Sequence, residues 1–325
     1  MLASMSKSLF LRRVGRRTAL RGGWALQKSS MATLVPPVEP VNYGKDFYLV
    51  RPEEKLSLEL ENKHALDECI TFDEDSHTYF FSNTKMNYSV TEVVSNYFEK
   101  FEPDVAIERM MNGPRWPRPE YQHKKDGRPF TPEEIKRQWD NIGEYARNRG
   151  TWMHYNIERY FNGLPPSEDL VELKQFTDFH KDVVEKRGVR PHRTEWRIAA
   201  PEVSLAGSVD FVGSLPDGTY CIMDWKRSKN LAGSMANTYG KLGKFPLDHL
   251  DDCEASKYFL QLNIYRHILQ KHYDIVISSM VLTSFHPHAD TYFATDVPIW
   301  EEEVDKVMQD LAADVVHDGD REIEF

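Results

Sequence analysis

The chain has 325 residues, of which 28% are charged and 40% hydrophobic, and its formal net charge is −10 at pH 7. This length permits one large domain or two modest ones, each with a sizeable core, and no stretch approaches the roughly 20 apolar residues of a membrane-spanning helix. Net negative charge disfavours non-specific binding to nucleic acid, so contacts with a phosphate backbone would require localised basic patches.

The N-terminal 38 residues differ from the rest of the chain in charge. They contain seven basic side chains and no acidic one, with serines and apolar residues between the arginines. This composition is typical of a mitochondrial transit peptide and lacks the uninterrupted apolar core of a secretory signal. We therefore expect residues 1–31 to be a transit peptide for the mitochondrial matrix. The alternative is a nuclear-localisation or nucleic-acid-binding arm, which would place the protein in the nucleus.

Residues 32–65 contain the proline-rich run VPPVEPV, which is followed by a charged, mostly polar stretch. This composition predicts a linker or flexible arm, and residues 66–325 are predicted to form a single domain. The three cysteines, Cys69, Cys221 and Cys253, are too few and too scattered for a four-cysteine cluster or a zinc site with two CxxC pairs. We expect no iron–sulfur cluster.

The predicted domain starts with two short β-like runs on either side of Asp75, followed by a helix. Ser89 is the expected N-cap of that helix, with Glu92 at the capping-box position.

Residues 109–149 form a basic segment in an otherwise acidic chain. They contain ten lysines or arginines and six acidic residues, and the interspersed aromatic residues include Trp116, Tyr121, Phe130 and Trp139. Cations that contact phosphates and aromatic faces that stack on bases would suit nucleic-acid binding. A solvated helical face next to a basic loop is an equally good interpretation. The candidate nucleic-acid contacts here are Arg115, Arg118, Lys124, Lys125 and Arg128.

A helix is predicted from Thr131, because threonine is a good N-cap, Pro132 suits the first helical position and Glu134 completes a capping box. Apolar residues continue at helical spacing and predict a buried face; they are Ile135, Trp139, Ile142 and Ala146. Gly150 is expected to separate this helix from the next.

The next predicted helix, GTWMHYNIERYFNG, places His154 and Glu158 four residues apart and so on one face. A lone histidine in such a helix is usually an ordinary core residue. A further amphipathic helix is predicted over residues 170–186, and Glu195 follows in the first long strand. Glu195 could belong to an acidic site, or it could form an ion pair with Arg193 or Arg197.

Two β-rich runs, residues 203–214 and 220–226, flank Pro216-Asp217-Gly218 and predict a hairpin. If its loop is Leu215–Thr219, Asp210 faces Asp224 across the two strands. Opposed carboxylates about 5 Å apart repel each other unless a cation lies between them. Lys226 shares a face with Asp224 because strand side chains alternate with a period of two. Two carboxylates and an ammonium are suited to holding Mg²⁺ and stabilising charge on a phosphate.

After this hairpin comes a long segment rich in small residues, in which Arg227 and Lys229 could line a path for nucleic acid. The helix SKYFLQLNIYRHIL then places Gln261 and Tyr265 at i and i+4. These two could equally be buried polar residues with ordinary partners. A buried strand and a closing helix over residues 299–317 end the predicted domain.

The runs AGSVD and IMDWK resemble the GxxD and DxK strands of the PD-(D/E)XK nuclease superfamily, specifically its RecB-type branch, which includes mitochondrial genome maintenance exonucleases. The His154 helix resembles the GxxxH…E helix of that branch, and the Gln261–Tyr265 helix resembles its QxxxY helix. The resemblance covers residues 69–317. It implies an α/β fold with a PD-(D/E)XK (restriction-endonuclease-like) core, a mixed central sheet flanked by helices, and helical N-terminal additions.

The resemblance also implies a function. It predicts a DNA nuclease dependent on Mg²⁺ or Mn²⁺, preferably an exonuclease on single-stranded ends, in mitochondrial DNA maintenance. The implied catalytic residues are Asp210, Asp224, Lys226, Gln261 and Tyr265, and the implied metal ligands are His154, Glu195, Asp210 and Asp224. Expected partners are single-stranded DNA and mitochondrial replication or repair proteins, and no membrane. The alternatives are an endonuclease for flap or branched DNA and a non-catalytic nucleic-acid-binding module with the same fold.

Overall fold

The computed structural model describes residues 35–45, 47, 49 and 56–321. The expected transit peptide lies outside these residues. Within the described part, two sheets form. The smaller is antiparallel, in the order β1-β2-β3, and its strands are β1 (Ile70–Asp73), β2 (Thr78–Phe81) and β3 (Thr84–Lys85).

The larger sheet is mixed, and its strands are β4 (Tyr88–Ser89), β5 (Arg190–Ala200), β6 (Leu205–Ser214), β7 (Tyr220–Lys226), β8 (Ile277–Ser284) and β9 (Phe293–Asp296). Antiparallel ladders join β5 to β6, β6 to β7 and β8 to β9, whereas β7 and β8 are parallel. The short strand β4 runs parallel to the first two residues of β6. Between its partners β4 and β7, the edge of β6 is left without a ladder from residue 207 to residue 210.

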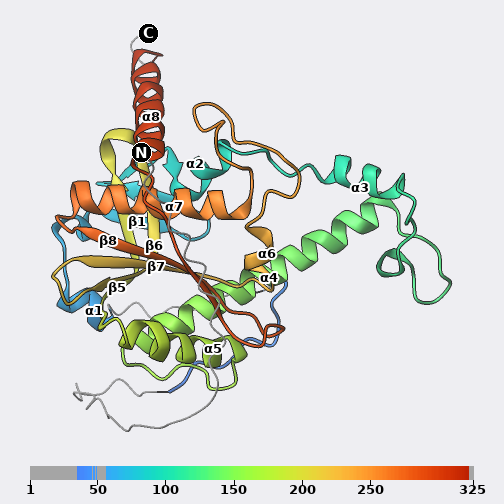
Figure 1. Ribbon diagram of the computed structural model, residues 1–325, viewed down its shortest axis with the longest axis horizontal. Helices are drawn as coiled ribbons and strands as arrows, with labels where there is room; N and C mark the ends of the chain where they lie inside the picture. The colour runs from blue at the N-terminus through green and yellow to red at the C-terminus, as the bar shows by residue number, and fades with distance from the viewer. Residues whose placement is uncertain (1–34, 46, 48, 50–55, 322–325) are drawn as a thin grey trace, which may run out of the picture. The chain divides into compact units, whose positions relative to one another are not determined.

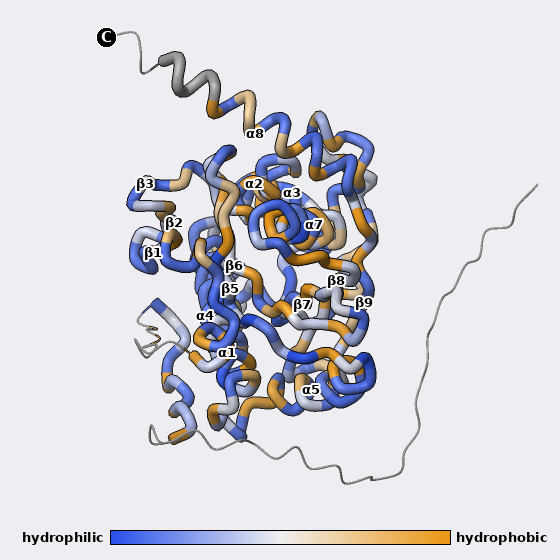
Figure 2. The backbone as a smooth tube through the Cα atoms, turned by 90° about the vertical axis from the view of Figure 1, so that its left-hand side faces the viewer, coloured by the Kyte–Doolittle hydropathy of each residue, from blue (hydrophilic) through white to orange (hydrophobic). Residues whose placement is uncertain are grey.

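Helices cover both faces of the larger sheet (Figure 1). The α-helices of the described residues are α1 (Ser57–Glu61), α2 (Val90–Asn96), α3 (Pro103–Met111), α4 (Pro132–Phe161), α5 (Val171–Phe179), α6 (Leu231–Ser234), α7 (Glu254–His272) and α8 (Glu301–Arg321). Residues of α2, α7 and α8 pack into the core on one face, and residues of α4 and α5 pack into the core on the other. Figure 2 shows the hydrophobic residues gathered around the sheet and α7, with hydrophilic residues along the outer loops.

The expected fold class is confirmed: the chain is α/β, with a mixed central sheet flanked by helices and further helices before the core. From α4 onwards the α-helices and strands follow in the order α4, α5, β5, β6, β7, α6, α7, β8, β9, α8. In the described part of the chain, no helix has both the length and the apolar character needed to cross a membrane.

The structure corrects the expected break at Gly150. Helix α4 runs without interruption from Pro132 to Phe161, with the predicted capping box at Thr131 and Glu134. A Cβ at Gly150 would meet no atom within 4 Å, so this glycine serves no close contact. Glycine costs about 1 kcal/mol relative to alanine in a helix interior, which is too little to end a helix whose last three turns are held by the core.

The buried face predicted for the first half of α4 is also largely wrong. Ile135 is fully buried, but the Ile142 side chain is 59% exposed and Ala146 is exposed as well. The first half of α4 projects beyond the sheet together with α3 (Figure 1). The apolar residues of this half therefore have no core to pack against, except in the turn that contacts α3.

Two further segments differ from expectation. Residues 170–186 form α5 and then a π-helical turn, His180–Glu185, in place of one α-helix. Inside the range expected to be a linker, α1 packs against the domain, where Leu58 is buried and its N–H donates to the side chain of Asn162.

Candidate active site

The β6–β7 hairpin forms in the predicted register. Ser214 pairs with Tyr220, and backbone hydrogen bonds close the loop Leu215–Thr219, in which Gly218 adopts a φ of +85°. The ladder continues to Phe211 and Met223 and ends there. Asp210 and Asp224 are the next residues of the two strands, and their charges interact.

The ladder ends at this point because side chains take over the hydrogen bonds of the Trp225 backbone. The Trp225 N–H donates to Asp210 Oδ2 at 2.8 Å, and the Trp225 carbonyl accepts from His154 Nε2 at 2.9 Å. Trp225 is the residue between Asp224 and Lys226. A side chain from β6 and one from α4 therefore fix the backbone that presents both of these site residues.

Three side chains form a group that could hold a metal ion. His154, Glu195 and Asp210 each offer one ligand atom, and these atoms lie within 4.8 Å of one another. The His154 Nδ1 is 3.2 Å from Glu195 Oε1 and 3.6 Å from Asp210 Oδ1. Because Nε2 must carry a hydrogen to bond the Trp225 carbonyl, Nδ1 is the nitrogen left to bind a metal in the neutral ring.

Glu195 has an unusual backbone. Its φ is +44°, in the left-handed region that residues with a side chain rarely adopt. The β5–β6 ladder pairs the residues on either side of it but skips Glu195 and Asp210 themselves. A conformation of this kind costs about 1–3 kcal/mol and persists where the surrounding structure imposes it, often at functional sites. Here this conformation occurs where the carboxylates of Glu195 and Asp210 approach each other, at the residue pair that the β5–β6 ladder skips.

The protonation of the group reflects its density of negative charge. Burial, together with the nearby carboxylates of Asp224 and Glu195, raises the pKa of Asp210 to about 7. Burial alone would lower the pKa of His154, but the carboxylates of Asp210 and Glu195 outweigh it and raise this pKa to about 9. The carboxylates thus favour a positive charge between them, and a divalent cation would supply one.

Asp224 and Lys226 form the second half of the site. Asp224 is almost fully buried, and its Oδ1 accepts a hydrogen bond from Lys226 Nζ at 3.1 Å. Its Oδ2 lies 2.8 Å from the same ammonium but accepts no well-aligned hydrogen bond. Burial alone would lower the pKa of Lys226, but the carboxylates of Asp224 and Asp210 raise it above its ordinary value. Lys226 is therefore a cation at neutral pH.

Helix α7 supplies the wall next to Lys226. Gln261 Oε1 is 3.5 Å from Lys226 Nζ, and Gln261 Nε2 donates to the Tyr265 hydroxyl at 3.0 Å. A Cβ at Gly207 would come within 2.8 Å of Tyr265 Cε1, so the glycine is needed for the close approach of the tyrosine to β6. The first glycine of the GxxD run and the tyrosine of the α7 pair are thus in direct contact.

Sequence reasoning missed Tyr258. The Lys226 Nζ lies 4.7 Å from the centroid of the Tyr258 ring, which is cation–π distance. Tyr258 precedes Gln261 by three residues and Tyr265 by seven, so the three lie on one face of α7. This helical spacing is the signal that the sequence offers. It points to a role for Tyr258 only once the position of Lys226 is known.

Glu158 is buried on α4 but does not belong to the group of His154, Glu195 and Asp210. The sequence left its role open between water-mediated metal binding and support of His154. Its place outside the group favours neither role directly.

The five candidate nucleic-acid contacts of the basic segment all lie exposed between α3 and α4. Arg115 and Arg118 line a cleft that the loop of residues 239–244 closes from the other side. Lys124 and Lys125 do not line this cleft. Arg128 is occupied by an ion pair with Glu134 at 3.0 Å. Lys229 is exposed beyond the end of β7.

The structure places Arg227 differently from expectation. Its side chain is only 9% exposed, and its Nε donates to Glu172 Oε1 at 2.7 Å. Consecutive residues of a strand point to opposite faces, so Arg227 faces α5 whereas Lys226 faces α7. It does not line an open path for nucleic acid.

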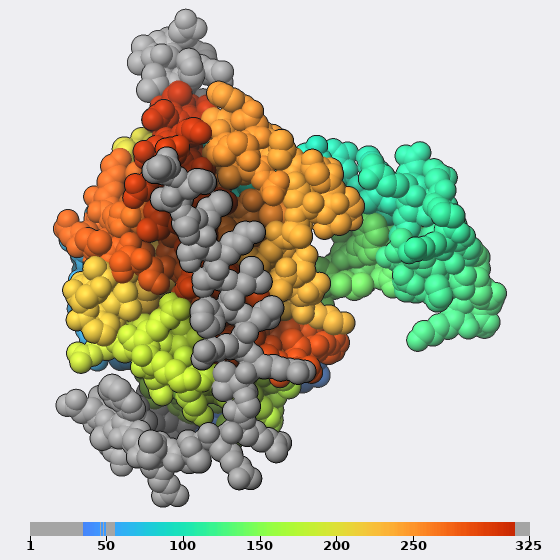
Figure 3. Space-filling model, viewed as in Figure 1, coloured from blue at the N-terminus to red at the C-terminus, as the bar shows by residue number. Residues whose placement is uncertain are grey.

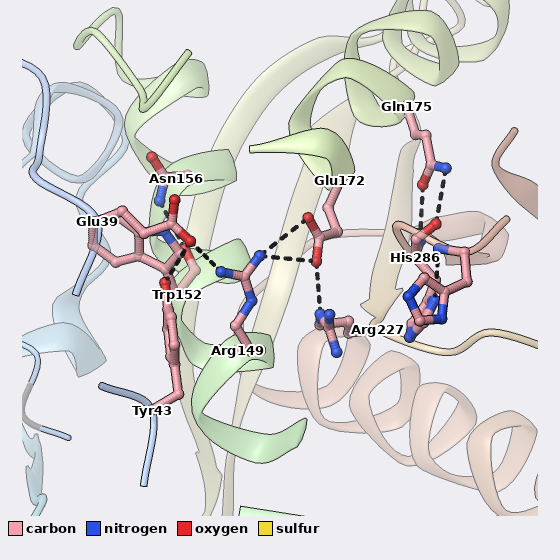
Figure 4. A network of polar contacts seen from close by, with 10 residues as sticks. Glu39, Tyr43, Arg149, Trp152, Asn156, Glu172, Gln175, Arg227 and His286 are labelled. Carbon is pink, nitrogen blue, oxygen red and sulfur yellow. Dashed lines mark hydrogen bonds and ion pairs between the residues drawn. The ribbon is translucent and has the colours of Figure 1, made fainter. Parts of the chain in front are cut away.

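Arg227 ends a chain of ion pairs centred on the fully buried Glu172 (Figure 4). Arg149 lies between Glu172, at 3.4 Å, and Glu39, and its guanidinium also covers the ring of Tyr43 at 4.7 Å. Two arginines thus share the fully buried carboxylate of Glu172. The network joins α4 and α5 to the residue that follows Lys226.

No protein-family model matches the chain, and no curated protein matches its sequence. Among solved structures, the crystal structure of an alkaline exonuclease (LHK-Exo) from Laribacter hongkongensis aligns with a TM-score of 0.30 and 12% identity, over 53% of this chain and 80% of that one. The crystal structure of SSO0001 aligns with a TM-score of 0.27 and 11% identity, over 70% and 75% of the two chains. At these low TM-scores the two structures assign no activity to this chain, so its chemistry is inferred from its own side chains.

Proposed function

We propose that the protein is a metal-dependent nuclease that hydrolyses the phosphodiester bonds of DNA. The observation that supports this best is the meeting of two sets of side chains where the β6–β7 ladder ends. One set, His154, Glu195 and Asp210, offers a nitrogen and two carboxylates to a cation. The other, Asp224 and Lys226, is a buried carboxylate with an ammonium beside it.

The donor set suits Mg²⁺ or Mn²⁺. Both ions prefer oxygen ligands, which Glu195 and Asp210 supply, whereas an imidazole nitrogen such as that of His154 is more typical of later transition metals. Asp224 lies outside this group and has one buried oxygen without a well-aligned hydrogen bond. A cation bound there would polarise a phosphate and lower the pKa of a water molecule.

The chain's own groups have roles that follow from their charge. Lys226 is a cation at neutral pH, so it donates hydrogen bonds to a phosphate oxygen or a water and does not act as a base. Gln261 is within reach of the ammonium and restricts where it can lie. His154 holds the Trp225 carbonyl through Nε2 and presents Nδ1 to the carboxylates.

The finer proposal is an exonuclease that degrades single-stranded DNA from its ends in mitochondrial DNA maintenance. It rests on the residue patterns of the α4 and α7 helices. The test is a cleavage assay with strands labelled at either end, in linear and circular form, with and without Mg²⁺. We expect metal-dependent loss of linear strands and survival of circles. Cleavage of circles would show an endonuclease, and binding without any cleavage would show a non-catalytic module.

The proposed mitochondrial location rests on the composition of residues 1–31. A reporter protein that carries these residues should enter the mitochondrial matrix. The protein without them should retain full nuclease activity in vitro. A reporter that accumulates in the nucleus would instead support the nuclear alternative.

A further inference from the structure

A second concave feature lies outside the candidate active site. It is a cleft of about 1090 Å³ between α3 with the residues that follow it and the loop of residues 239–244. Figure 3 shows a hollow between this loop and the α3–α4 segment. We call it the α3 cleft. It is larger than the roughly 300–1,000 Å³ that hold a single small molecule.

The α3 cleft is strongly basic in an acidic protein. It is lined by two acidic residues, Glu99 and Glu102, and by six cationic ones: Lys100, Arg109, Arg115, Arg118, Lys241 and Lys244. One of these cations, Lys241, is paired with Glu99. The ligand that such a surface attracts carries several negative charges.

The α3 cleft also presents large aromatic side chains to solvent. Phe101 is 70% exposed and Tyr239 is 83% exposed, one on each wall. Phe101 packs against Trp139 of α4, with ring centroids 5.8 Å apart. Exposed aromatic faces in a basic cleft are suited to stacking on flat ring systems that carry negative charge nearby.

Both walls lead directly to elements of the candidate active site. Helix α3 and the basic segment continue into α4, which carries His154. The loop of residues 239–244 lies between β7, which carries Lys226, and α7, which carries Gln261. The two walls of the α3 cleft are thus connected along the chain to the elements that form the site.

We propose that the α3 cleft binds single-stranded nucleic acid, with unpaired bases stacked on Phe101 and Tyr239 and phosphates held by the surrounding arginines and lysines. Stacking needs bases that are free of a complementary strand, and it tolerates any sequence because every base has a flat face. The α3 cleft thus supplies the preference for single strands in the proposed nuclease function, on which this inference rests.

The test is a double variant, Phe101→Ala with Tyr239→Ala, in the full chain. Binding of a fluorescent 20-nucleotide oligothymidylate is measured with Ca²⁺ in place of Mg²⁺, to limit cleavage. We expect the dissociation constant to rise at least tenfold. An abasic oligonucleotide of equal length should bind the wild type more weakly and should be unaffected by the substitutions. The matched control is Phe245→Ala, which removes an 85% exposed aromatic from the same loop that does not line the α3 cleft.

Three results would overturn the inference. They are unchanged oligothymidylate binding by the double variant, an equal loss for abasic and base-containing strands, and displacement of the oligonucleotide by polyglutamate as readily as by unlabelled DNA. Both substituted side chains are largely exposed, so the fold should survive, and circular dichroism checks this. If the double variant is unfolded, the single variant Tyr239→Ala is measured against the same outcomes.

A small diester separates this inference from the proposed function. Hydrolysis of bis(p-nitrophenyl) phosphate needs the metal site but not the α3 cleft. If the protein hydrolyses this diester and the double variant still binds oligothymidylate normally, the nuclease assignment stands and the inference fails. If it binds the oligonucleotide through the two aromatics but hydrolyses neither diester nor DNA, the inference stands and the nuclease assignment fails.

Discussion

The two halves of α4 belong to different environments. From Trp152 to Phe161 most side chains are buried against the sheet, and His154 bonds the Trp225 carbonyl just beyond the end of the β6–β7 ladder. From Pro132 to Arg149 only Ile135 is buried, and this half projects with α3 and the basic segment. One continuous helix thus carries a site residue at its buried end and supports the α3 cleft at its exposed end. The comparison suggests that chemistry and substrate capture are separable within this chain.

The largest effect is expected on the cleavage rate, from substitutions in the candidate active site at the buried end of α4. Replacing Asp224 by Asn keeps the shape but removes a charge that would help to hold a metal ion. Several kcal/mol of transition-state stabilisation should vanish, so the cleavage rate should fall at least a thousandfold. Lys226→Ala should be similarly inactive while still binding DNA, because the α3 cleft is intact. Single-turnover cleavage and oligonucleotide binding measure the two effects. Near wild-type cleavage by both variants would show that this is not a nuclease site.

The next effect concerns the boundary between the halves, where Arg149 meets Glu172. Glu172→Gln leaves two largely buried arginines with a shared neutral partner, and we expect the free energy of unfolding to fall by about 3–5 kcal/mol at pH 7. Asp182→Asn, which breaks the exposed ion pair with Lys186, is the control and should cost under about 1 kcal/mol. Urea unfolding measures both.

The Glu172 effect should depend on pH. Burial alone would raise the pKa of Glu172, but Arg227 and Arg149 hold it below its ordinary value of 4.5. Its charge therefore stabilises the folded protein fully above pH 4.5, and this contribution disappears as the pH falls through the lowered pKa. The difference in unfolding free energy between wild type and Glu172→Gln should narrow in acid. A difference that is constant with pH would mean that the glutamate contributes packing and not charge.

A smaller effect is expected from Tyr258. If its ring positions the Lys226 ammonium, Tyr258→Leu should lower kcat about tenfold with KM unchanged, because a cation–π contact of this kind contributes on the order of 1–2 kcal/mol. Tyr258→Phe keeps the ring and should retain activity. Steady-state kinetics on an oligonucleotide substrate distinguish the two. Equal losses in both variants would indicate that the hydroxyl matters instead.

The sequence predicted the site around the buried half of α4 better than the segment around its exposed half, and the reason is physical. The hairpin register follows from a turn with proline and glycine, and the shared face of Asp224 and Lys226 follows from strand alternation. The same alternation places Arg227 on the opposite face. The sequence could not show that Arg227 pairs with Glu172, because the two residues are 55 positions apart in the chain. Tyr258 and the α3 cleft likewise depend on contacts between distant segments. Apolar spacing around Ile142 indicated a helix correctly but could not show that the helix leaves the core.

The smallest expected effect is at the exposed end, and it tests whether the basic segment binds as a whole or only where it lines the α3 cleft. Each phosphate contact on a single strand contributes about 0.7 to the slope of log K against log salt. Arg115→Gln with Arg118→Gln should therefore reduce that slope by about 1.4, while turnover of a small diester stays unchanged. Lys124→Gln with Lys125→Gln removes the same charge from residues of the same segment that do not line the cleft. We expect little change in slope from this second pair, because lysines outside the cleft have no walls to hold a strand near them. Equal losses from both pairs would extend the binding surface to the end of the projecting segment, and no loss from either would mean that the segment is an ordinary solvated surface.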